Sequence, residues 1–240
     1  YGLDLYKKRA LPELLQALSD VDGIEWIRLH YAYPTKFPME IIEAMASRPE
    51  ICNYLDIPLQ HASDRMLKRM RRQTTAQYQE QLIRDIRSIL PEIRIRTTFL
   101  LGFPGETEED FQYLKDQVQS LQFDRLGVFQ YSHEEGTSAY EFEDDVSHEV
   151  KVRRSNELME LQSHISQAKN SALIGQKMKV LFDRKESGYF IGRTEFDSPE
   201  VDNEVKVDAQ KYFVRVGDFA EVEITDAEIY DLHGKILVNE

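Results

Sequence analysis

Strand-like and helix-like patterns alternate over the first half of the chain, from residue 9 to about residue 131. Short apolar runs, typical of buried strands, are separated by segments in which apolar residues recur every three or four positions, as on one face of a helix. Consecutive parallel strands need a crossover connection, and helical crossovers are right-handed. The alternation therefore predicts an α/β fold that contains part of a parallel βα barrel. The predicted strands span residues 26–31, 54–59, 93–101 and 126–131, and the predicted helices begin near Leu11, Pro38 and Thr75.

One strand-to-helix junction carries the clearest local signals. Residues 96–111 read RTTFLLGFPGETEEDF, an apolar run that breaks at Gly102 and Pro104 before a helix that Thr107 would cap. Acidic residues in the first turn suit the positive end of a helix. In parallel α/β folds the turns at the carboxyl ends of strands bind ligands, although glycine-rich turns with a purely structural role are common. The segment is thus a candidate ligand-binding turn, and an ordinary tight turn is the alternative.

After Gly175 the apolar pattern changes to a period of two. Met178, Val180 and Phe182 alternate with polar residues, and turn-forming residues separate the short runs that follow. Short strands of this kind predict a small, closed antiparallel β-barrel.

A long polar segment connects the two patterns. Residues 147–172 carry apolar residues on one face only. This pattern predicts a long helix that either spans the distance between two parts of the protein or docks against one of them. We place a domain boundary near residue 173, so that residues 1–173 form the α/β domain and residues 174–240 form the barrel.

Charge and cysteine content narrow the function classes. Forty-three acidic residues against thirty basic ones give a formal net charge of −13, which argues against a general nucleic-acid binder and favours a basic protein partner. The single cysteine, Cys52, permits neither an intrachain disulfide nor a multi-cysteine metal site. We therefore expect the protein to be located in the reducing cytoplasm. No apolar run approaches the roughly 18 residues of a membrane helix. The chain opens without methionine on YGLDLY, which we interpret as the start of a fragment or processed product.

Polar side chains follow the apolar runs of several predicted strands. Because the carboxyl ends of parallel strands meet at one edge, these residues together predict a binding cleft there. His61 would act as a base or hold a ligand in one interpretation, and in the other it is an ordinary hydrogen-bonded structural histidine. Adjacent Glu134 and Glu135 point to different sides, so we interpret them as a solvated loop rather than a catalytic pair. The strand-end residues are Arg28, His30, Gln60, His61, Thr97, Thr98, Gln130, Tyr131 and Ser132.

Three segments carry a family resemblance. DIPLQHASDRMLKRMRR, TTFLLGFPGETEEDF and FQYSHEEGTSAY, in this order and spacing, resemble the radical S-adenosylmethionine methylthiotransferases, and the module from Gly175 resembles that family's TRAM domain. The resemblance covers essentially the whole chain. It implies a transferase, with residues 1–173 as the C-terminal part of the radical SAM barrel and residues 174–240 as the TRAM domain.

The resemblance also implies cofactors. The full-length enzyme would use S-adenosylmethionine and two 4Fe-4S clusters, held by three cysteines of an upstream domain and by a CxxxCxxC loop of the barrel. Cys52 sits in none of those motifs, so we expect this chain to hold no metal, to carry no cluster and to be inactive alone. No catalytic residue is assigned. The residues that the resemblance places around S-adenosylmethionine are Gln60, His61, Thr98, Gly102, Gln130, Tyr131 and Ser132.

Two branches of the family differ in substrate. The RimO-type branch modifies the β-carbon of an aspartate in the twelfth small-subunit ribosomal protein, and the other branch modifies a tRNA adenosine. Residues 173–240 contain nine basic and fifteen acidic residues, a balance that would repel a phosphate backbone and attract a basic protein. We therefore expect a basic ribosomal protein as partner, with neither nucleic acid nor membrane as a direct one. The candidate substrate-binding residues, all in the acidic stretch 192–207, are Glu195, Asp197, Glu200, Asp202 and Glu204.

Two alternatives stay open at this point. The first is the tRNA-modifying branch of the same family. The second belongs to another class, a non-catalytic protein- or RNA-binding module in which the partial barrel is only a scaffold.

Overall fold

The computed structural model describes residues 1–237, which form two compact units. The first unit comprises residues 1–162, and the second begins at Ser163, within a long helix α7 (His148–Ser171). Each unit has its own sheet. The domain boundary near residue 173 stays a proposal. Within the described residues, no helix has the length and apolar character needed to cross a bilayer.

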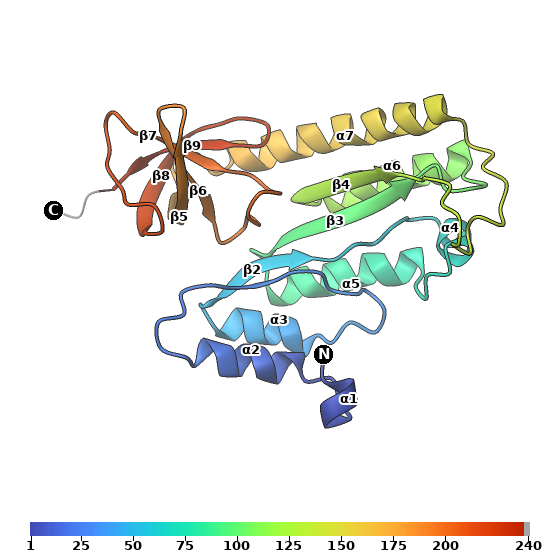
Figure 1. Cartoon of the computed structure of the whole chain (residues 1–240), viewed down its shortest axis with the longest axis horizontal. Coiled ribbons are helices and arrows are strands. Elements are labelled where there is room, and N and C mark those ends of the chain that lie inside the picture. Colours follow the sequence, from blue (N-terminus) through green and yellow to red (C-terminus); the bar gives the residue numbers. More distant parts are fainter. Residues whose placement is uncertain (238–240) are drawn as a thin grey trace. The chain divides into compact units, whose positions relative to one another are not determined.

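The first unit contains a four-stranded sheet whose strands run in chain order. Figure 1 shows β2, β3 and β4 side by side in this order. All three neighbouring pairs are parallel, which confirms the predicted βα fold. The strands are β1 (Ile27–Leu29), β2 (Ile51–Asp56), β3 (Arg94–Leu101) and β4 (Arg125–Gln130).

Two strands differ in extent from the prediction. The first is shorter, and Tyr31 beyond it has φ 60, a left-handed conformation that an extended strand does not contain. The second begins earlier and ends at Asp56, because Pro58 lacks the N–H that a regular ladder needs. Beyond Asp56 the chain still follows β3, since the N–H of Ile57 donates to the carbonyl of Arg96 at 2.9 Å.

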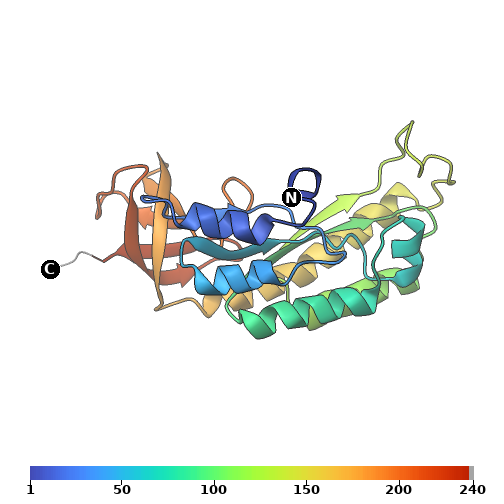
Figure 2. The same cartoon turned by 90° about the horizontal axis from the view of Figure 1, so that it is seen from below.

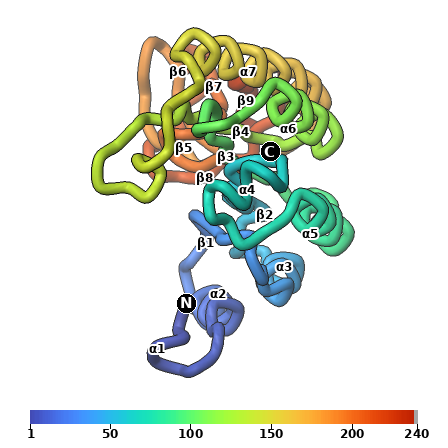
Figure 3. Tube along the Cα trace, turned by 90° about the vertical axis from the view of Figure 1, so that its right-hand side faces the viewer, coloured from blue at the N-terminus to red at the C-terminus, as the bar shows by residue number. Residues whose placement is uncertain are grey.

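Helices cover one side of this sheet. Figures 2 and 3 show α2, α3 and α5 along one side of the strands. The helices of the first unit, besides the start of α7, are α1 (Leu3–Tyr6), α2 (Leu11–Ser19), α3 (Glu40–Ser47), α4 (Asp64–Arg69), α5 (Ala76–Ile89) and α6 (Glu108–Leu121).

The two faces of β3 differ in burial. Ile95, Thr97, Phe99 and Leu101 are buried beneath the helices, whereas the residues between them are partly exposed. This alternation follows from the period of two along a strand. The partly exposed side is called the open face, and the residues that define it here are Asp56, Arg96, Thr98, Leu100, Gly127 and Phe129.

The second unit is a closed barrel of five strands in the order β5-β6-β7-β9-β8. Four of its strand pairs are antiparallel, and β7 with β9 is parallel. Alternate residues such as Val180, Val205 and Val222 are fully buried in its core, which confirms the prediction from the period of two. The strands are β5 (Lys177–Glu186), β6 (Tyr189–Thr194), β7 (Val205–Asp208), β8 (Phe219–Ala227) and β9 (Leu232–Ile236).

Candidate functional site

The turn between β3 and α6, residues 102–106, lies at the carboxyl edge of the sheet. Gly102 and Gly105 have φ 70 and 82, values that favour glycine. The side chain of Glu106 folds back, and its Oε2 accepts the N–H of Gly102 at 2.8 Å. Thr107 then caps α6 in a reciprocal capping box with Asp110. The local structure predicted for this junction is therefore present.

The turn after β2 contains Gln60 and His61. Gln60 has φ 72, its N–H donates to the carbonyl of Thr98 at 2.9 Å, and its own carbonyl accepts the N–H of Leu100 at 2.8 Å. These bonds bring the backbones of Gln60 and Thr98 together. That the two residues share a binding cleft stays a prediction. The side chain of Gln60 is partly exposed.

The imidazole of His61 is completely buried. Its Nδ1 accepts the backbone N–H groups of Ala62 and Ser63 at 2.9 and 3.0 Å, so the proton of the neutral ring lies on Nε2. Nε2 is 3.5 Å from Oε2 of Glu106. In this structure Nδ1 of His61 is bonded to the backbone, whereas Nε2 is buried without a hydrogen-bond partner among the described residues. The choice between the two interpretations of His61 stays a prediction.

The open face carries polar and apolar groups side by side. A Cβ on Gly127 would lie 3.5 Å from both Oγ1 of Thr98 and Nη2 of Arg96, so the missing side chain leaves space beside those two groups. Nε of Arg96 is 4.0 Å from Oδ2 of Asp56, and Phe129 is 65% exposed. A hydroxyl, a guanidinium, a carboxylate and an exposed ring suit a ligand with polar groups and a flat aromatic part.

Sequence reasoning selected Thr98 on this face and missed Arg96, Asp56 and Phe129. A signal for Arg96 was available, because Arg94 and Arg96 alternate with isoleucines along β3. That alternation places both arginines opposite the helices.

The three site residues predicted at the end of β4 differ in exposure. Gln130 and Ser132 are exposed, and the Ser132 hydroxyl donates to Glu134. Tyr131 is only 9% exposed and packs against Phe103, with ring centroids 5.1 Å apart. Burial, with smaller contributions from Asp144 and Glu134, raises the pKa of Tyr131. Its ring belongs to a small apolar cluster rather than to the open face.

Lys151 of α7 contacts three segments at the carboxyl edge of the parallel sheet. Its Nζ lies 2.7 and 2.9 Å from the two carboxylate oxygens of Asp144 and donates to the carbonyl of Tyr131 at 3.3 Å. Its methylene chain passes directly over Gly102, where a Cβ would lie 2.3 Å from Cγ of Lys151. Gly102 is thus required by the close approach of Lys151 as well as by its φ.

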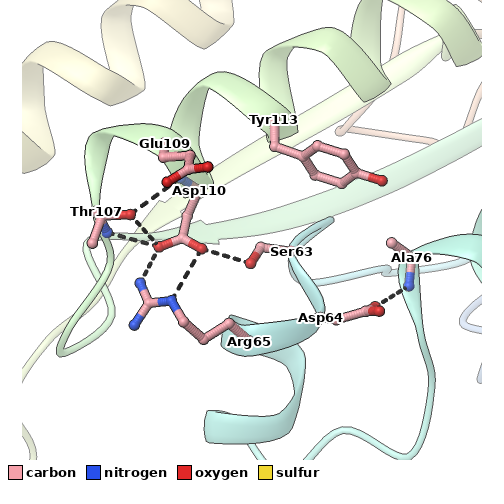
Figure 4. Close-up of a pocket in the computed structure, with 8 residues that line it drawn as sticks. All are labelled: Ser63, Asp64, Arg65, Ala76, Thr107, Glu109, Asp110 and Tyr113. Carbon is pink, nitrogen blue, oxygen red and sulfur yellow. Dashed lines mark hydrogen bonds and ion pairs between the residues drawn. The ribbon is translucent and has the colours of Figure 1, made fainter.

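A pocket of about 470 Å³ lies between the starts of α4, α5 and α6, as Figure 4 shows. Asp110 accepts hydrogen bonds from Arg65, from the Ser63 hydroxyl at 2.6 Å and from the N–H of Thr107 at 2.9 Å. Asp64 caps α5 through the N–H of Ala76 at 2.6 Å. These polar groups bond to one another, so we interpret them as a clip that joins α4 to α6.

The clip predicts how stability depends on pH. Burial alone would raise the pKa of Asp110, but hydrogen bonds from Arg65, Ser63 and Thr107 outweigh it and hold this pKa well below its usual range. A carboxyl whose pKa is lowered on folding contributes stability above its unfolded pKa of about 4 and loses that contribution as the pH falls towards the folded value. We expect Asp110→Asn to lower the free energy of unfolding by about 1–3 kcal/mol at pH 7 and by less at pH 3.

Urea unfolding of the wild-type chain and Asp110→Asn at the two pH values measures this difference. Asp116→Asn, at an exposed position of α6, is the matched control and should change little at either pH. An equal loss for Asp110→Asn at pH 3 and pH 7 would contradict the prediction.

The acidic stretch of the second unit forms a structured turn. Asp197 is 2% exposed and its carboxylate accepts the Thr194 hydroxyl at 2.6 Å, while Asp202 accepts the N–H of Ser198 at 2.9 Å. Glu204 pairs with both terminal nitrogens of Arg184 at 2.6 and 2.9 Å.

The five candidate substrate residues therefore differ in exposure. Glu200 is exposed, Glu195, Asp202 and Glu204 are partly exposed, and Asp197 is buried. Glu200, Asp202 and Glu204 line a pocket of about 500 Å³.

Among residues 1–237, no group of three or more His, Cys, Asp or Glu side chains has an arrangement that could hold a metal ion. Cys52 is buried in β2. The chemistry of a 4Fe-4S cluster, which needs several thiolates, does not fit the donors described here. Whether the chain carries a cluster stays a prediction.

Comparisons with known proteins agree with both units. The Radical SAM superfamily matches residues 3–118, and the TRAM domain family matches residues 174–237. A curated relative from Flavobacterium johnsoniae, named ribosomal protein uS12 methylthiotransferase RimO, is 58% identical over 98% of this chain and 54% of its own length. A protein of the same name from Bacteroides thetaiotaomicron is 52% identical over 99% of this chain and 55% of its own length. The chain thus spans about half the length of these curated relatives.

A solved structure shows the same fold. Coproporphyrinogen III oxidase from Escherichia coli, described as a radical SAM enzyme, superposes with a TM-score of 0.51 over 64% of this chain and 36% of its own length, at 19% identity. At that identity the likeness concerns the fold alone.

Proposed function

The chain belongs to the radical SAM methylthiotransferases of the RimO type, and from this premise we propose that it is part of an enzyme that adds a methylthio group to the β-carbon of an aspartate in ribosomal protein uS12. The names of its relatives and the pairing of a radical SAM unit with a TRAM unit support this reaction. The observation that carries the proposal is the open face of the parallel sheet. It ends at the turn 102–106, which the family's motif occupies.

The open face fits S-adenosylmethionine. When bound, this cofactor together with an iron–sulfur cluster supplies the radical chemistry that an unactivated carbon requires. The space beside Gly127 admits a ligand next to the hydroxyl of Thr98 and the guanidinium of Arg96, and the exposed ring of Phe129 offers a surface for stacking. Thr98 and Arg96 would orient polar groups of the cofactor, while Gln60 shapes the adjoining turn.

We propose that the cysteines that hold the iron–sulfur clusters lie in the part of the relatives' length that this chain does not span. The isolated chain is then inactive and carries no cluster. Anaerobic iron and sulfide reconstitution of residues 1–240 tests this, and an iron–sulfur absorption band would contradict it.

Charge on the second unit supports a basic protein as substrate. The excess of acidic over basic residues from 173 to 240 favours association with a cationic surface and opposes contact with phosphates. Glu200 is the exposed member of the candidate set, and we propose that it contacts uS12. A ribosomal substrate and the single cysteine, Cys52, support a cytoplasmic location for the proposed reaction.

The charge proposal predicts weaker binding when Glu200 is reversed. We expect Glu200→Lys to raise the Kd of the chain for uS12 by about three- to tenfold at low salt, because a rim charge acts through long-range attraction. A titration of labelled uS12 with the chain measures the change, and the difference should shrink as salt is added. Glu92→Lys, an exposed position of the first unit, makes the same change in net charge and should have little effect.

Binding of tRNA separates the two branches of the family. Specific, salt-dependent tRNA binding without binding of uS12 would overturn the proposed substrate. Activity is tested in the full-length, reconstituted enzyme, where the mass of a uS12 peptide should increase by one methylthio group. Absence of that product while tRNA is modified would favour the tRNA-modifying branch.

A further inference from the structure

Three buried polar side chains from distant parts of the chain meet behind the turn 102–106. His61 follows β2, Glu106 ends the turn after β3, and Arg154 lies on α7. Their side chains are 0%, 0% and 5% exposed. All three belong to the first unit.

Glu106 is the centre of this network. Its Oε1 lies 2.7 Å from Nη1 of Arg154, and its Oε2 accepts the N–H of Gly102 at 2.8 Å and faces Nε2 of His61 at 3.5 Å. Nη1 of Arg154 also donates to the backbone carbonyl of Glu106 at 3.2 Å. The turn is therefore held at its first residue through the N–H of Gly102 and at its last through the carbonyl of Glu106.

His61 extends the network to the neighbouring turn. Because its Nδ1 accepts two backbone N–H groups, the orientation of the ring is determined by the chain from Ala62 to Ser63. Its Nε2 lies 3.5 Å from Oε2 of Glu106, close enough for electrostatic contact although no hydrogen bond joins the two atoms. The turns after β2 and β3, which flank Thr98, thus approach each other at one buried carboxylate.

Stability alone does not account for such an arrangement. Burying charges is costly, and well-packed apolar side chains often replace a buried ion pair without loss of stability. What apolar side chains cannot supply is the set of directed bonds to Gly102 and to the carbonyl of Glu106. The contribution particular to this network is therefore geometric.

We propose that His61, Glu106 and Arg154 are positioning residues that hold the turns after β2 and β3 in the shape that binds S-adenosylmethionine. His61 acts through Glu106 in this proposal and does not contact the cofactor. The inference rests on the proposed function, since it assumes that the open face binds this cofactor.

The test separates charge balance from geometry. In the full-length, reconstituted enzyme, Arg154→Met leaves Glu106 without its main counterion and should lower the melting temperature strongly. The double variant Glu106→Gln and Arg154→Met removes both buried charges. Glu108, which Arg154 also contacts at 3.2 Å, keeps its pair with Arg153, so the double variant should recover most of that loss. We expect the double variant still to bind S-adenosylmethionine at least tenfold more weakly than wild type, because the bond to the carbonyl of residue 106 is gone.

Equilibrium binding of S-adenosylmethionine is the principal readout, and hydrogen exchange of the Gly102 amide is the second. Exchange at Gly102 should be faster in both variants, independently of any activity. Arg153→Met is the matched control, since Arg153 is the preceding residue of α7 and pairs with exposed Glu108 and with Glu157. It should leave both readouts unchanged.

A wild-type affinity in the double variant would overturn the inference. If that variant does not fold, Arg154→Lys replaces it, because lysine keeps the charge beside Glu106 but cannot make both contacts. A Kd for Arg154→Lys equal to that of wild type would then overturn the inference, and a Kd several-fold higher would support it. Failure of the wild-type enzyme itself to bind S-adenosylmethionine would count against the proposed function, whereas the exchange of Gly102 would still report on the network.

Discussion

Gly102→Ala is expected to lower the free energy of unfolding by about 2–5 kcal/mol and to disorder the turn 102–106. Two effects combine. The φ of 70 costs a residue with a Cβ about 1–2 kcal/mol. The new Cβ would also lie 2.3 Å from Cγ of Lys151, a clash in the middle of a side chain that its ion pair with Asp144 holds in place. Overpacking of this kind costs about 1–3 kcal/mol more.

Denaturant unfolding of the chain measures this loss, and Gly136→Ala is its control. Gly136 has φ 78, but a Cβ there meets no atom within 4 Å, so only the conformational cost applies. Gly102→Ala should cost less in a Lys151→Ala background than in the wild-type background, because the clash is absent there. Equal losses for Gly102→Ala and Gly136→Ala would show that Lys151 does not determine the residue at position 102.

In the second unit, Gly192→Ala is expected to lower the free energy of unfolding by about 2–4 kcal/mol. Gly192 on β6 lies opposite Phe182 of β5, and its φ is not in the left-handed region. A Cβ would lie 2.6 Å from both the carbonyl oxygen of Leu181 and Cγ1 of Val180. Backbone atoms of a paired strand cannot move aside without breaking the ladder. Close strand approach of this kind is one reason for glycine within a barrel.

Hydrogen exchange over residues 177–236, together with denaturant unfolding, measures the effect on the barrel. Gly217→Ala is the control, because its φ is 95 and a Cβ there meets nothing within 4 Å. We expect Gly217→Ala to cost only the conformational penalty of about 1–2 kcal/mol. A smaller loss for Gly192→Ala than for Gly217→Ala would contradict the steric explanation.

Most secondary structure was predictable because its causes are local. The apolar stripe that begins at Phe111 and the cap at Thr107 lie within one or two turns of each other, so their pattern identifies α6 directly. Alternation along β3 and β5 depends only on the period of two of a strand. The ends of β1 and β2 were less predictable from apolar patterns, which report neither the left-handed conformation of Tyr31 nor the missing N–H of Pro58.

Which strand-end residues lie near one another was predictable, and the direction of their side chains was much less so. The backbones of Gln60 and Thr98 are hydrogen-bonded, as expected for the carboxyl edge of parallel strands. Tyr131 instead enters an apolar cluster beside Phe103, and Asp197 turns inward to Thr194. Arg96 was missed although its alternation with isoleucine was visible. The assignment of cofactor contacts among these residues stays a proposal.

By itself the sequence determined that this chain forms parallel βα units followed by a small barrel, and that its motifs are those of the radical SAM methylthiotransferases. Only the tertiary structure decided which groups surround His61. A strand-end histidine has the same local pattern whether it faces a cleft or a buried carboxylate. Glu106, which lies 3.5 Å from His61, and Arg154, which pairs with Glu106, lie far along the chain and come near His61 only when β2, β3 and α7 pack together. Local patterns report periodicity and capping, whereas the partners of a buried polar group are set by which distant segments the fold brings within hydrogen-bonding distance.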